Sequence, residues 1–297
     1  MWPLYIILNK FLKTEEENGR GPDGDHSTAV EAYSFERSLI NDKYNDAVLP
    51  HSHFIEVPLI NQQCTWDCGL ACVLMVLRTL GIGNCDIQEL GELCNTTSIW
   101  TVDLAYLLQN FSVHFSYFTV TLGANPNFSV ETFYKEQLPN DLVRVDMLFQ
   151  KALEGGMNIQ CRSISGEEIS LLILSGKYIA IALVDQYKLR YSCDIILPLC
   201  SVSLGWRMLG FLASIVAAQA TLVGHYVVIC GYDALTDEFE IRDPASSGKH
   251  EKVTSKRLEE ARKSFGTDED LLLISLEKGE NQNTHSVQLS SLITFDR

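Results

Sequence analysis

The chain has 297 residues, with 23 Lys and Arg against 38 Asp and Glu, which gives a net charge of −15. A chain this acidic lacks the basic face needed for sequence-independent nucleic-acid binding or for electrostatic attachment to anionic membranes. Its 46% hydrophobic and 21% charged residues are typical of a globular protein with one large domain or two small ones.

The cysteines and the N-terminus indicate the compartment. Nine cysteines, an odd number, favour a reduced intracellular chain over a disulfide-linked secreted one. The first twelve residues are rich in apolar side chains, but they have no basic start and no small-residue cleavage site, so they do not resemble a signal peptide. We therefore expect a cytoplasmic protein, and the sequence does not indicate its oligomeric state.

Changes in composition predict the domain organisation. We expect an N-terminal segment and mobile linker over residues 1–47, one domain over residues 48–278 and a disordered tail over residues 279–297. An apolar stretch at about residues 190–223 interrupts the domain. It is as long as a transmembrane helix, but Pro198, Gly205 and Gly210 break it. We interpret it as an anomalous insertion and expect no stable membrane span.

The first half of the domain favours helices and the second half favours strands. Apolar periodicity predicts helices over 69–80, 86–94, 101–110 and 142–153, with a strand over 113–121. Ser165 and Glu168 have the spacing of a capping box, which predicts a helix ending near residue 175. Runs rich in β-branched residues predict strands over 178–184, 225–231, 239–242 and 271–276. This order predicts an α+β fold with an antiparallel sheet.

The strongest chemical signal lies between Gln62 and Cys72. Cys68 lies where a loop enters the first long helix, and the partial positive charge of a helix N-terminus stabilises a thiolate there. The side-chain amide of Gln62, on the incoming loop, can donate to an oxyanion beside the sulfur. Cys72 is predicted to be a small buried hydrophobe. Cys64, Cys68 and Cys72 have no nearby histidine to complete a zinc site, so we predict no metal there.

A thiolate nucleophile also needs a base and an acceptor that orients the base. Of the seven histidines, His225 alone opens a β-rich run directly after a glycine. The run HYVVICGYD, the turn ALTDE and the run FEIRDPA predict a hairpin that brings His225 beside Asp243. A carboxylate there would hold one imidazole nitrogen and leave the other facing the sulfur.

These motifs resemble a known peptidase family and, more closely, a plant family. Gln-x4-Asp-Cys-Gly-x-Ala-Cys, His-Tyr-Val-Val and Asp-Pro-Ala are similar to the papain-like bacteriocin-processing peptidases. That resemblance implies a papain-like fold in which a nucleophile helix packs on an antiparallel sheet. It also implies a catalytic set made of Gln62, Cys68, His225 and Asp243. From about Phe54 to Leu276 the chain resembles the plant soluble guanylyl cyclase family, through segments such as VPLINQQCTWDCGLACVLMVLRTLG and KSFGTDEDLLL.

The two resemblances imply different activities. The plant family name implies conversion of GTP to 3′,5′-cyclic GMP and diphosphate, a lyase reaction with Mg²⁺ or Mn²⁺ as the expected cofactor. The peptidase resemblance implies a cysteine hydrolase that acts on peptide or isopeptide bonds and needs no cofactor. A non-catalytic interaction module is a third hypothesis, in which Trp100 and Tyr106 form an exposed groove, although core packing suits these two side chains better. The partner is therefore either GTP or a peptide substrate.

The residues themselves favour a thiol enzyme over a cyclase. No Gly-rich phosphate-binding motif is present, and no pair of aspartates has an evident two-metal pattern. Acidic candidates are Asp67, Asp103, Asp233, Asp243, Asp268, Glu269 and Asp270, and the run from Thr267 to Asp270 is typical of a solvated turn before a strand. Basic candidates for a triphosphate are Arg78, Lys135, Arg144, Arg242 and Lys263, each typical of a surface charge.

Overall fold

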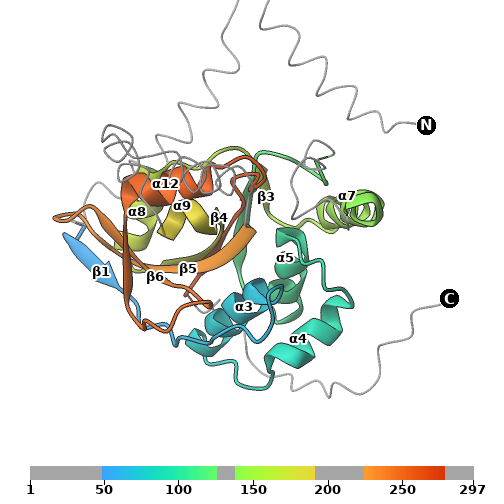
Figure 1. Ribbon diagram of the computed structural model, residues 1–297, viewed down its shortest axis with the longest axis horizontal. Coiled ribbons are helices and arrows are strands. Elements are labelled where there is room, and N and C mark those ends of the chain that lie inside the picture. Colours follow the sequence, from blue (N-terminus) through green and yellow to red (C-terminus); the bar gives the residue numbers. More distant parts are fainter. Residues whose placement is uncertain (1–48, 126–137, 191–223, 278–297) are drawn as a thin grey trace, which may run out of the picture. The chain divides into compact units, whose positions relative to one another are not determined.

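The structure is a computed structural model that describes residues 49–125, 138–190 and 224–277 (Figure 1). Side chains are described for the same ranges except residues 138 and 139. The predicted N-terminal segment and linker, almost all of the apolar insertion and the predicted tail lie outside the described residues, so these three assignments stay predictions.

A sheet forms the centre of the described chain, with strand order β3-β2-β8-β4-β5-β6-β7 and β1 beside β5 (Figure 1). The strands are β1 Ser52–Phe54, β2 Phe115–Thr119, β3 Ile159–Cys161, β4 Tyr178–Asp185, β5 Gly224–Asp233, β6 Glu238–Arg242, β7 Glu251–Thr254 and β8 Leu271–Ser275. β2 and β3 pair in parallel, and the other pairs are antiparallel. The sheet is therefore antiparallel except at one edge.

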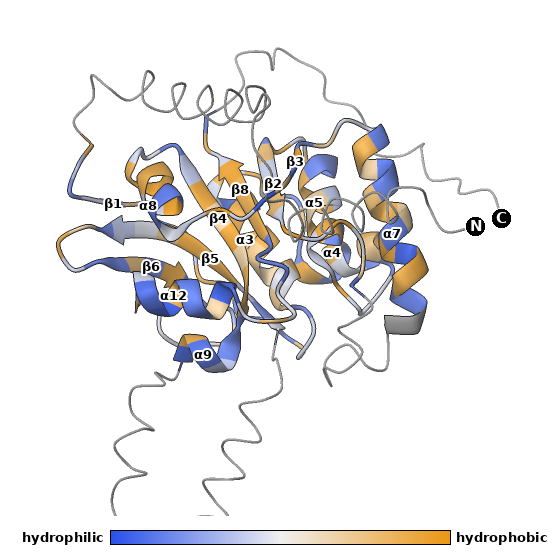
Figure 2. Cartoon of the chain, turned by 90° about the horizontal axis from the view of Figure 1, so that it is seen from above, coloured by the Kyte–Doolittle hydropathy of each residue, from blue (hydrophilic) through white to orange (hydrophobic). Residues whose placement is uncertain are grey.

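Helices cover both faces of this sheet. They are α3 Cys68–Thr79, α4 Ile87–Cys94, α5 Thr101–Asn110, α7 Leu138–Glu154, α8 Gly166–Leu174, α9 Gln186–Arg190 and α12 Ser255–Arg262. Figure 1 shows α3, α4, α5 and α7 on one side and α8, α9 and α12 on the other. The central strands are the most apolar elements, whereas α9 and α12 are mainly hydrophilic (Figure 2). This is the layered arrangement that the amphipathic patterns require.

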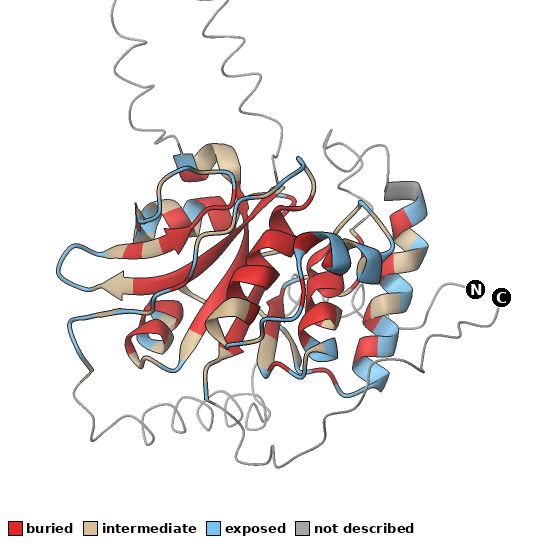
Figure 3. Cartoon of the chain, turned by 90° about the horizontal axis from the view of Figure 1, so that it is seen from below, coloured by how far each residue is buried: buried red, intermediate tan, exposed pale blue. Residues whose placement is uncertain are grey.

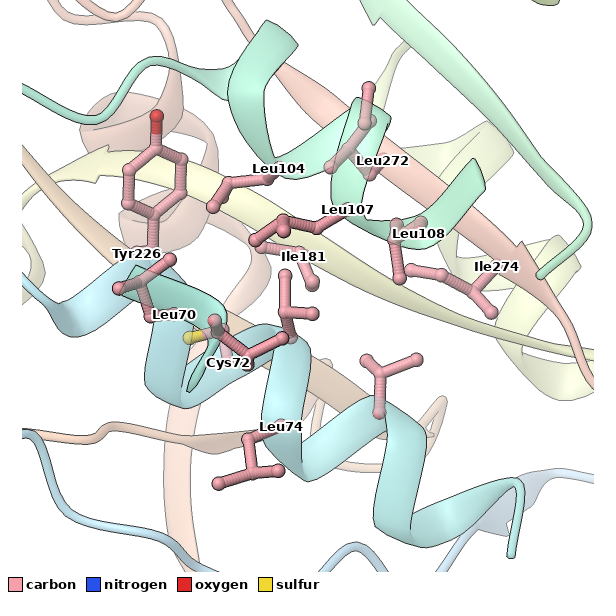
Figure 4. Packing of buried hydrophobic residues seen from close by; sticks show 14 of the residues in the cluster. Leu70, Cys72, Leu74, Leu104, Leu107, Leu108, Ile181, Tyr226, Leu272 and Ile274 are labelled. Carbon is pink, nitrogen blue, oxygen red and sulfur yellow. The ribbon is translucent and has the colours of Figure 1, made fainter. Parts of the chain in front are cut away.

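Side chains of β5 alternate between two hydrophobic clusters. Tyr226, Val228 and Cys230 pack with the residues of α3 and α5, while Val227 and Ile229 pack with those of α8 and α12. Alternation of this kind is the geometry of a strand buried on both faces. The helix α3 is buried from Cys68 to Leu77, and Figures 3 and 4 show it packed against the central strands. The first residue of α3 is therefore fixed by the core.

Local sequence signals set several helix ends, and the capping box predicted at Ser165 and Glu168 is confirmed. Asp86 and Glu89 form a capping box before α4, and Ser165 and Glu168 form one before α8. Gly81, with φ of 80°, follows the end of α3, a backbone conformation that glycine adopts at low cost. The helices predicted over 86–94 and 101–110 are confirmed with nearly the same bounds.

The predicted α+β class is confirmed. A helix that begins with Cys68 packs on a mainly antiparallel sheet, as the resemblance to papain-like peptidases implied. Elements that the sequence patterns did not predict are the short strands β1, β3 and β7 and the polar helices α9 and α12. In the described ranges, no helix combines the length and the apolar character needed to cross a membrane.

Arg242, at the end of β6, is fully buried. Its Nε donates to the carbonyl oxygen of Val57 at 2.9 Å and its Nη1 pairs with a carboxylate oxygen of Glu240 at 3.0 Å. The guanidinium carbon also lies 5.1 Å from the centre of the Phe54 ring. Arg242 therefore joins the segment before the nucleophile loop to the strand that leads to Asp243.

We expect Arg242→Ala to lower the free energy of unfolding by about 3–5 kcal/mol, because it leaves buried acceptors without their donor. Urea denaturation followed by circular dichroism measures this change. The control is Lys252→Ala on the neighbouring strand β7, whose exposed side chain should contribute no more than about 0.5 kcal/mol. Equal midpoints for the two variants would contradict the assigned role.

Candidate active site

Cys68 is the first residue of α3 and is 6% exposed. The loop before it is shaped by the buried carboxylate of Asp67, which accepts hydrogen bonds from the backbone N–H groups of Gln63 and Cys64 at 3.1 and 3.0 Å. The first N–H groups of a helix have no intrahelical acceptor, and they carry the positive end of the helix dipole. The Cys68 sulfur therefore lies where the helix dipole favours a negative charge.

Gly69 allows the sheet to approach the start of this helix. A Cβ atom at this position would lie 3.0 Å from the Leu104 side chain and 3.1 Å from the Tyr226 ring. Those distances are too short for a side chain without displacement of its neighbours. Because β5 and α3 meet here, His225 at the beginning of β5 lies near the beginning of α3.

His225 and Asp243 lie side by side, as the predicted hairpin required. The Nε2 atom of His225 is 2.6 Å from Oδ1 of Asp243, and both side chains are buried. The imidazole is also hydrogen-bonded to Cys68. Because Asp243 occupies Nε2, the nitrogen left for the sulfur is Nδ1.

Asp243 is held from several directions. Its Oδ1 atom also accepts the Ala245 backbone N–H at 2.8 Å, and its Oδ2 atom pairs with Nη2 of Arg190 at 3.1 Å. Burial raises the pKa of Asp243, but the hydrogen bond and charge of His225 and the hydrogen bonds from Ala245 and Arg190 lower it to about 2. The carboxylate is therefore ionised throughout the physiological range. Sequence analysis missed Arg190, since its contact exists only once α9 packs near the end of β6.

His225 is set to carry a positive charge. Burial lowers its pKa, but the hydrogen bonds with Asp243 and Cys68 and the negative charges of both raise it to about 9. Near neutral pH the imidazole is accordingly protonated. It places a proton donor beside the Cys68 sulfur, the arrangement that a cysteine nucleophile needs.

Gln62 lies on the loop before α3, where both its side chain and its backbone are hydrogen-bonded. Its Nε2 atom donates to the Cys64 carbonyl oxygen at 2.7 Å, and its backbone N–H donates to the Pro244 carbonyl oxygen at 3.0 Å. Its Oε1 atom is buried and has no hydrogen-bond partner within the described ranges. The structure thus ties Gln62 to the segment after Asp243, while its predicted role as an oxyanion donor stays a prediction.

Three other described cysteines are less suited to act as nucleophiles. Burial raises the pKa of the Cys72 thiol well above its usual range, and the charges of Cys68 and Asp243 add to this effect. Burial also raises the pKa of Cys94 and of Cys230 to about 12. The seven described cysteines form no disulfide with one another. Cys72 is a buried residue of the core, as the sequence predicted.

The turn predicted over residues 267–270 before a strand is confirmed, but the prediction that it is solvated is wrong. Thr267 and Asp270 are buried, at 0% and 5% exposure, and Asp268 is partly buried. Asp268 and Glu269 have φ values of 48° and 52°, so this short segment turns sharply into β8. The packing of α5 beside β8 buries part of this turn. A pattern of polar residues does not predict that burial.

A metal and triphosphate site of the kind expected for a cyclase does not fit the described residues. Nowhere in the described ranges do three or more His, Cys, Asp or Glu side chains form a group that could hold a metal ion. Arg78 donates to the carbonyl oxygens of Ile82 and Cys85, and Arg242 is buried. Arg144 forms ion pairs with Asp103 and Asp141, and Lys263 forms one with Glu259. The last basic candidate, Lys135, lies outside the described residues.

The aromatic pair proposed for an interaction groove lies in the core instead. Trp100 is 7% exposed, and its Nε1 donates to Asp141 at 3.1 Å. Tyr106 packs against the same hydrophobic cluster and donates to the carbonyl oxygen of Leu148 at 3.1 Å. Core packing of both side chains is therefore confirmed. These two side chains do not form the exposed groove on which the non-catalytic hypothesis was based.

Comparisons with known proteins agree with the second resemblance. The sequence model of a family described as "Guanylylate cyclase" matches residues 57–274, a range that includes Gln62, Cys68, His225 and Asp243. "Guanylyl cyclase 1" of Arabidopsis thaliana is 58% identical over 285 residues, which cover 95% of this chain and 99% of that protein.

Solved structures with lower similarity include two peptidases. A putative C39-like peptidase from Bacillus anthracis has a TM-score of 0.42 and 14% identity, and covers 75% of this chain and 96% of that one. The peptidase domain of Streptococcus ComA has a TM-score of 0.36 and 15% identity, and covers 74% of this chain and 98% of that one. Because the family model and the Arabidopsis relative both span most of its length, the chain belongs to the guanylylate cyclase family.

Proposed function

We propose that this domain is a thiol hydrolase in which Cys68 is the nucleophile, His225 the general acid and base, and Asp243 the acceptor that orients His225. The observation that carries the proposal is the continuous hydrogen-bonded series from Cys68 through His225 to Asp243. A thiolate paired with an imidazolium is suited to acyl transfer from peptide or isopeptide bonds.

The reaction proceeds through two acyl-transfer steps. The Cys68 thiolate attacks the substrate carbonyl carbon, and the electron pair of the C=O bond moves to oxygen. When the tetrahedral intermediate collapses, the C–N bond breaks and the His225 imidazolium gives its proton to the leaving amine. The neutral imidazole then takes a proton from water, whose oxygen attacks the thioester and releases the acid and the Cys68 thiolate. The Cys68 backbone N–H, at the start of α3, is a candidate oxyanion donor.

Conversion of GTP to cyclic GMP is the second candidate, and the name of the Arabidopsis relative supports it. In that reaction the ribose 3′-oxygen attacks the α-phosphorus and expels diphosphate. Bound Mg²⁺ or Mn²⁺ would neutralise the phosphate charge. The described residues offer no metal cluster for this step, so the geometry supports the thiol hydrolase better.

The proposed function predicts that Cys68 reacts first with iodoacetamide near neutral pH. A thiolate is the reactive form, and Cys68 lies at a helix N-terminus beside a protonated His225, whereas burial raises the pKa of Cys72, Cys161 and Cys230. The native chain is treated with less than one equivalent of reagent, digested and analysed by mass spectrometry. Earlier labelling of Cys72 or Cys161 than of Cys68 would contradict the proposal.

A further inference from the structure

A groove lies beside the candidate nucleophile, between the loop that leads into α3 and the helix α4, and we call it the α4 groove. Its walls come from that loop and from α4, and they include Cys64, Trp66, Asp67, Ile87, Gly91 and Glu92. Its volume is about 470 Å³, which lies in the range of about 300–1,000 Å³ found for sites that hold small ligands. The proposed catalytic steps use none of these side chains.

Gly91 keeps the α4 groove open. It lies inside α4, where a glycine is less favourable than an alanine because it loses more backbone freedom on folding. Its φ is not positive, and a Cβ atom there would lie 3.7 Å from the Leu70 side chain and 3.8 Å from the Trp66 ring, which are ordinary contacts. Neither the backbone conformation nor close packing therefore requires a glycine, whereas a larger side chain would fill the groove beside Trp66.

Trp66 gives the α4 groove an aromatic wall. Its indole is half-buried and packs against the hydrophobic cluster that contains α3, and most of the surface that the groove exposes is apolar. An aromatic ring that packs on an indole gains from stacked or edge-to-face contact in addition to the burial of its apolar area. The groove therefore suits an aromatic side chain.

The charges of the α4 groove disfavour an acidic group. Among the described residues that line it, the charged side chains are those of Asp67 and Glu92, and both are acidic. Backbone N–H groups of the loop donate to Asp67, and Nε2 of Gln88 donates to Glu92 at 3.1 Å. A carboxylate in the groove would therefore meet like charge. A cationic group would have to compete with these donors for both carboxylates.

The α4 groove begins one residue from the nucleophile. Asp67 lines the groove and Cys68 follows it directly, and the Cα atoms of consecutive residues are about 3.8 Å apart. An extended peptide advances about 3.3 Å per residue. A substrate side chain one to three residues from the bond under attack is therefore within reach of the groove.

Helix α3 separates the α4 groove from the strand that carries His225. It packs against β5 on one side and against α4 on the other (Figure 1). The leaving amine has to lie beside His225, because the imidazolium gives it a proton. The acyl part of the substrate is therefore the part that extends toward α4.

We infer that the α4 groove is a substrate subsite that binds an aromatic side chain in the acyl part of a peptide substrate. Its role in catalysis rests on the proposed thiol chemistry, but the binding of an aromatic peptide does not. Two measurements therefore distinguish the failure of the subsite from the failure of the proposed function.

The first measurement detects binding without any reaction. Cys64 is an exposed thiol on the α4 groove, so an occupant should shield it from a thiol reagent. The full-length Cys68→Ala chain is treated with N-ethylmaleimide, and mass spectrometry gives the labelling rates of Cys64 and of Cys161, an exposed thiol on β3. An acetylated alanine pentapeptide amide with a central Phe should slow the labelling of Cys64 at least about 3-fold and leave that of Cys161 unchanged.

Filling the groove should remove this protection. Gly91→Leu places a side chain beside Trp66, whereas the same change at Gly83, an exposed glycine that does not line the groove, should keep the protection. Gly91→Gln is measured beside Gly91→Leu, and circular dichroism checks that each variant is folded, so a folding defect in one does not decide the result. Equal protection by peptides with a central Phe and a central Glu, or no protection by either, would overturn the inference.

The second measurement tests the substrate preference of the reaction. Fluorogenic peptide amides that carry Phe, Ala or Glu at each of the three acyl positions nearest the scissile bond are compared by kcat/KM. At one of these positions Phe should exceed Ala by about 10- to 100-fold, the factor expected from the burial of an aromatic ring, and Glu should be the poorest. Gly91→Leu should reduce the ratio of Phe to Ala to near one, and Gly83→Leu should keep it.

The two measurements together separate the two ideas. Hydrolysis with no preference for Phe at any position would refute the subsite alone. Protection of Cys64 by the Phe peptide together with no hydrolysis of any peptide would refute the proposed thiol chemistry and retain the α4 groove as a site for an aromatic side chain.

Discussion

Cys68→Ala is expected to lower the rate of peptide or ester hydrolysis by at least about 10³-fold, because the variant has no atom that can form the thioester. The assay compares the purified wild-type chain and the variant on fluorogenic peptide amides and esters. Loss of the thiol should cost only about 1 kcal/mol of stability, so the variant should remain folded at the assay temperature. Circular dichroism checks this point.

The matched control is Cys161→Ala, which removes an exposed thiol from the edge strand β3 and should keep full activity. The same two variants are incubated with GTP and either Mg²⁺ or Mn²⁺. Formation of cyclic GMP that persists in Cys68→Ala and requires the metal would favour the second candidate function over the first. Hydrolysis that survives in Cys68→Ala would exclude Cys68 as the nucleophile.

Asp243→Asn should lower kcat/KM by about 10²- to 10⁴-fold and move the alkaline limit of activity to lower pH. The imidazolium of His225 must give a proton to the leaving amine, so activity should fall as pH rises through its pKa of about 9. Asp243 raises that pKa through its hydrogen bond and its charge. Without the carboxylate the pKa falls, and a smaller fraction of the imidazole is protonated near neutral pH.

A pH series of kcat/KM for the wild type and for Asp243→Asn measures both effects. The control is Asp237→Asn, an exposed acid-to-amide change in the turn of the same hairpin, which should leave the profile in place. An alkaline limit that stays at the same pH in Asp243→Asn would mean that Asp243 does not control the proton on His225.

Arg190 adds a second expectation to this series. The Arg190 guanidinium pairs with Oδ2 of Asp243. Removing this guanidinium should make the Asp243 carboxylate more mobile while the carboxylate keeps its charge. The pH limit of activity in Arg190→Met should therefore move less than in Asp243→Asn. This difference separates an effect of position from an effect of charge.

Amino-acid patterns alone determined a large part of this architecture. Helices over 86–94 and 101–110 were predictable because their apolar spacing is regular and because capping residues such as Asp86 act over only three or four positions. The hairpin that joins His225 to Asp243 was predictable because its two β-rich runs flank a short turn. These are local effects, and they agree with the tertiary structure.

Only the tertiary structure decided which polar residues are buried and which pair with one another. β7 and α12 are so rich in charged residues that their sequences show no regular spacing of apolar residues. They form because the sheet and α9 pack against them. Asp270 resembles a solvated residue in the sequence, yet α5 and β8 close over it. Arg190 reaches Asp243 across 53 residues, a separation at which sequence spacing contains no information on distance. The charge on His225 likewise depends on burial and on the two partners that the fold brings to it.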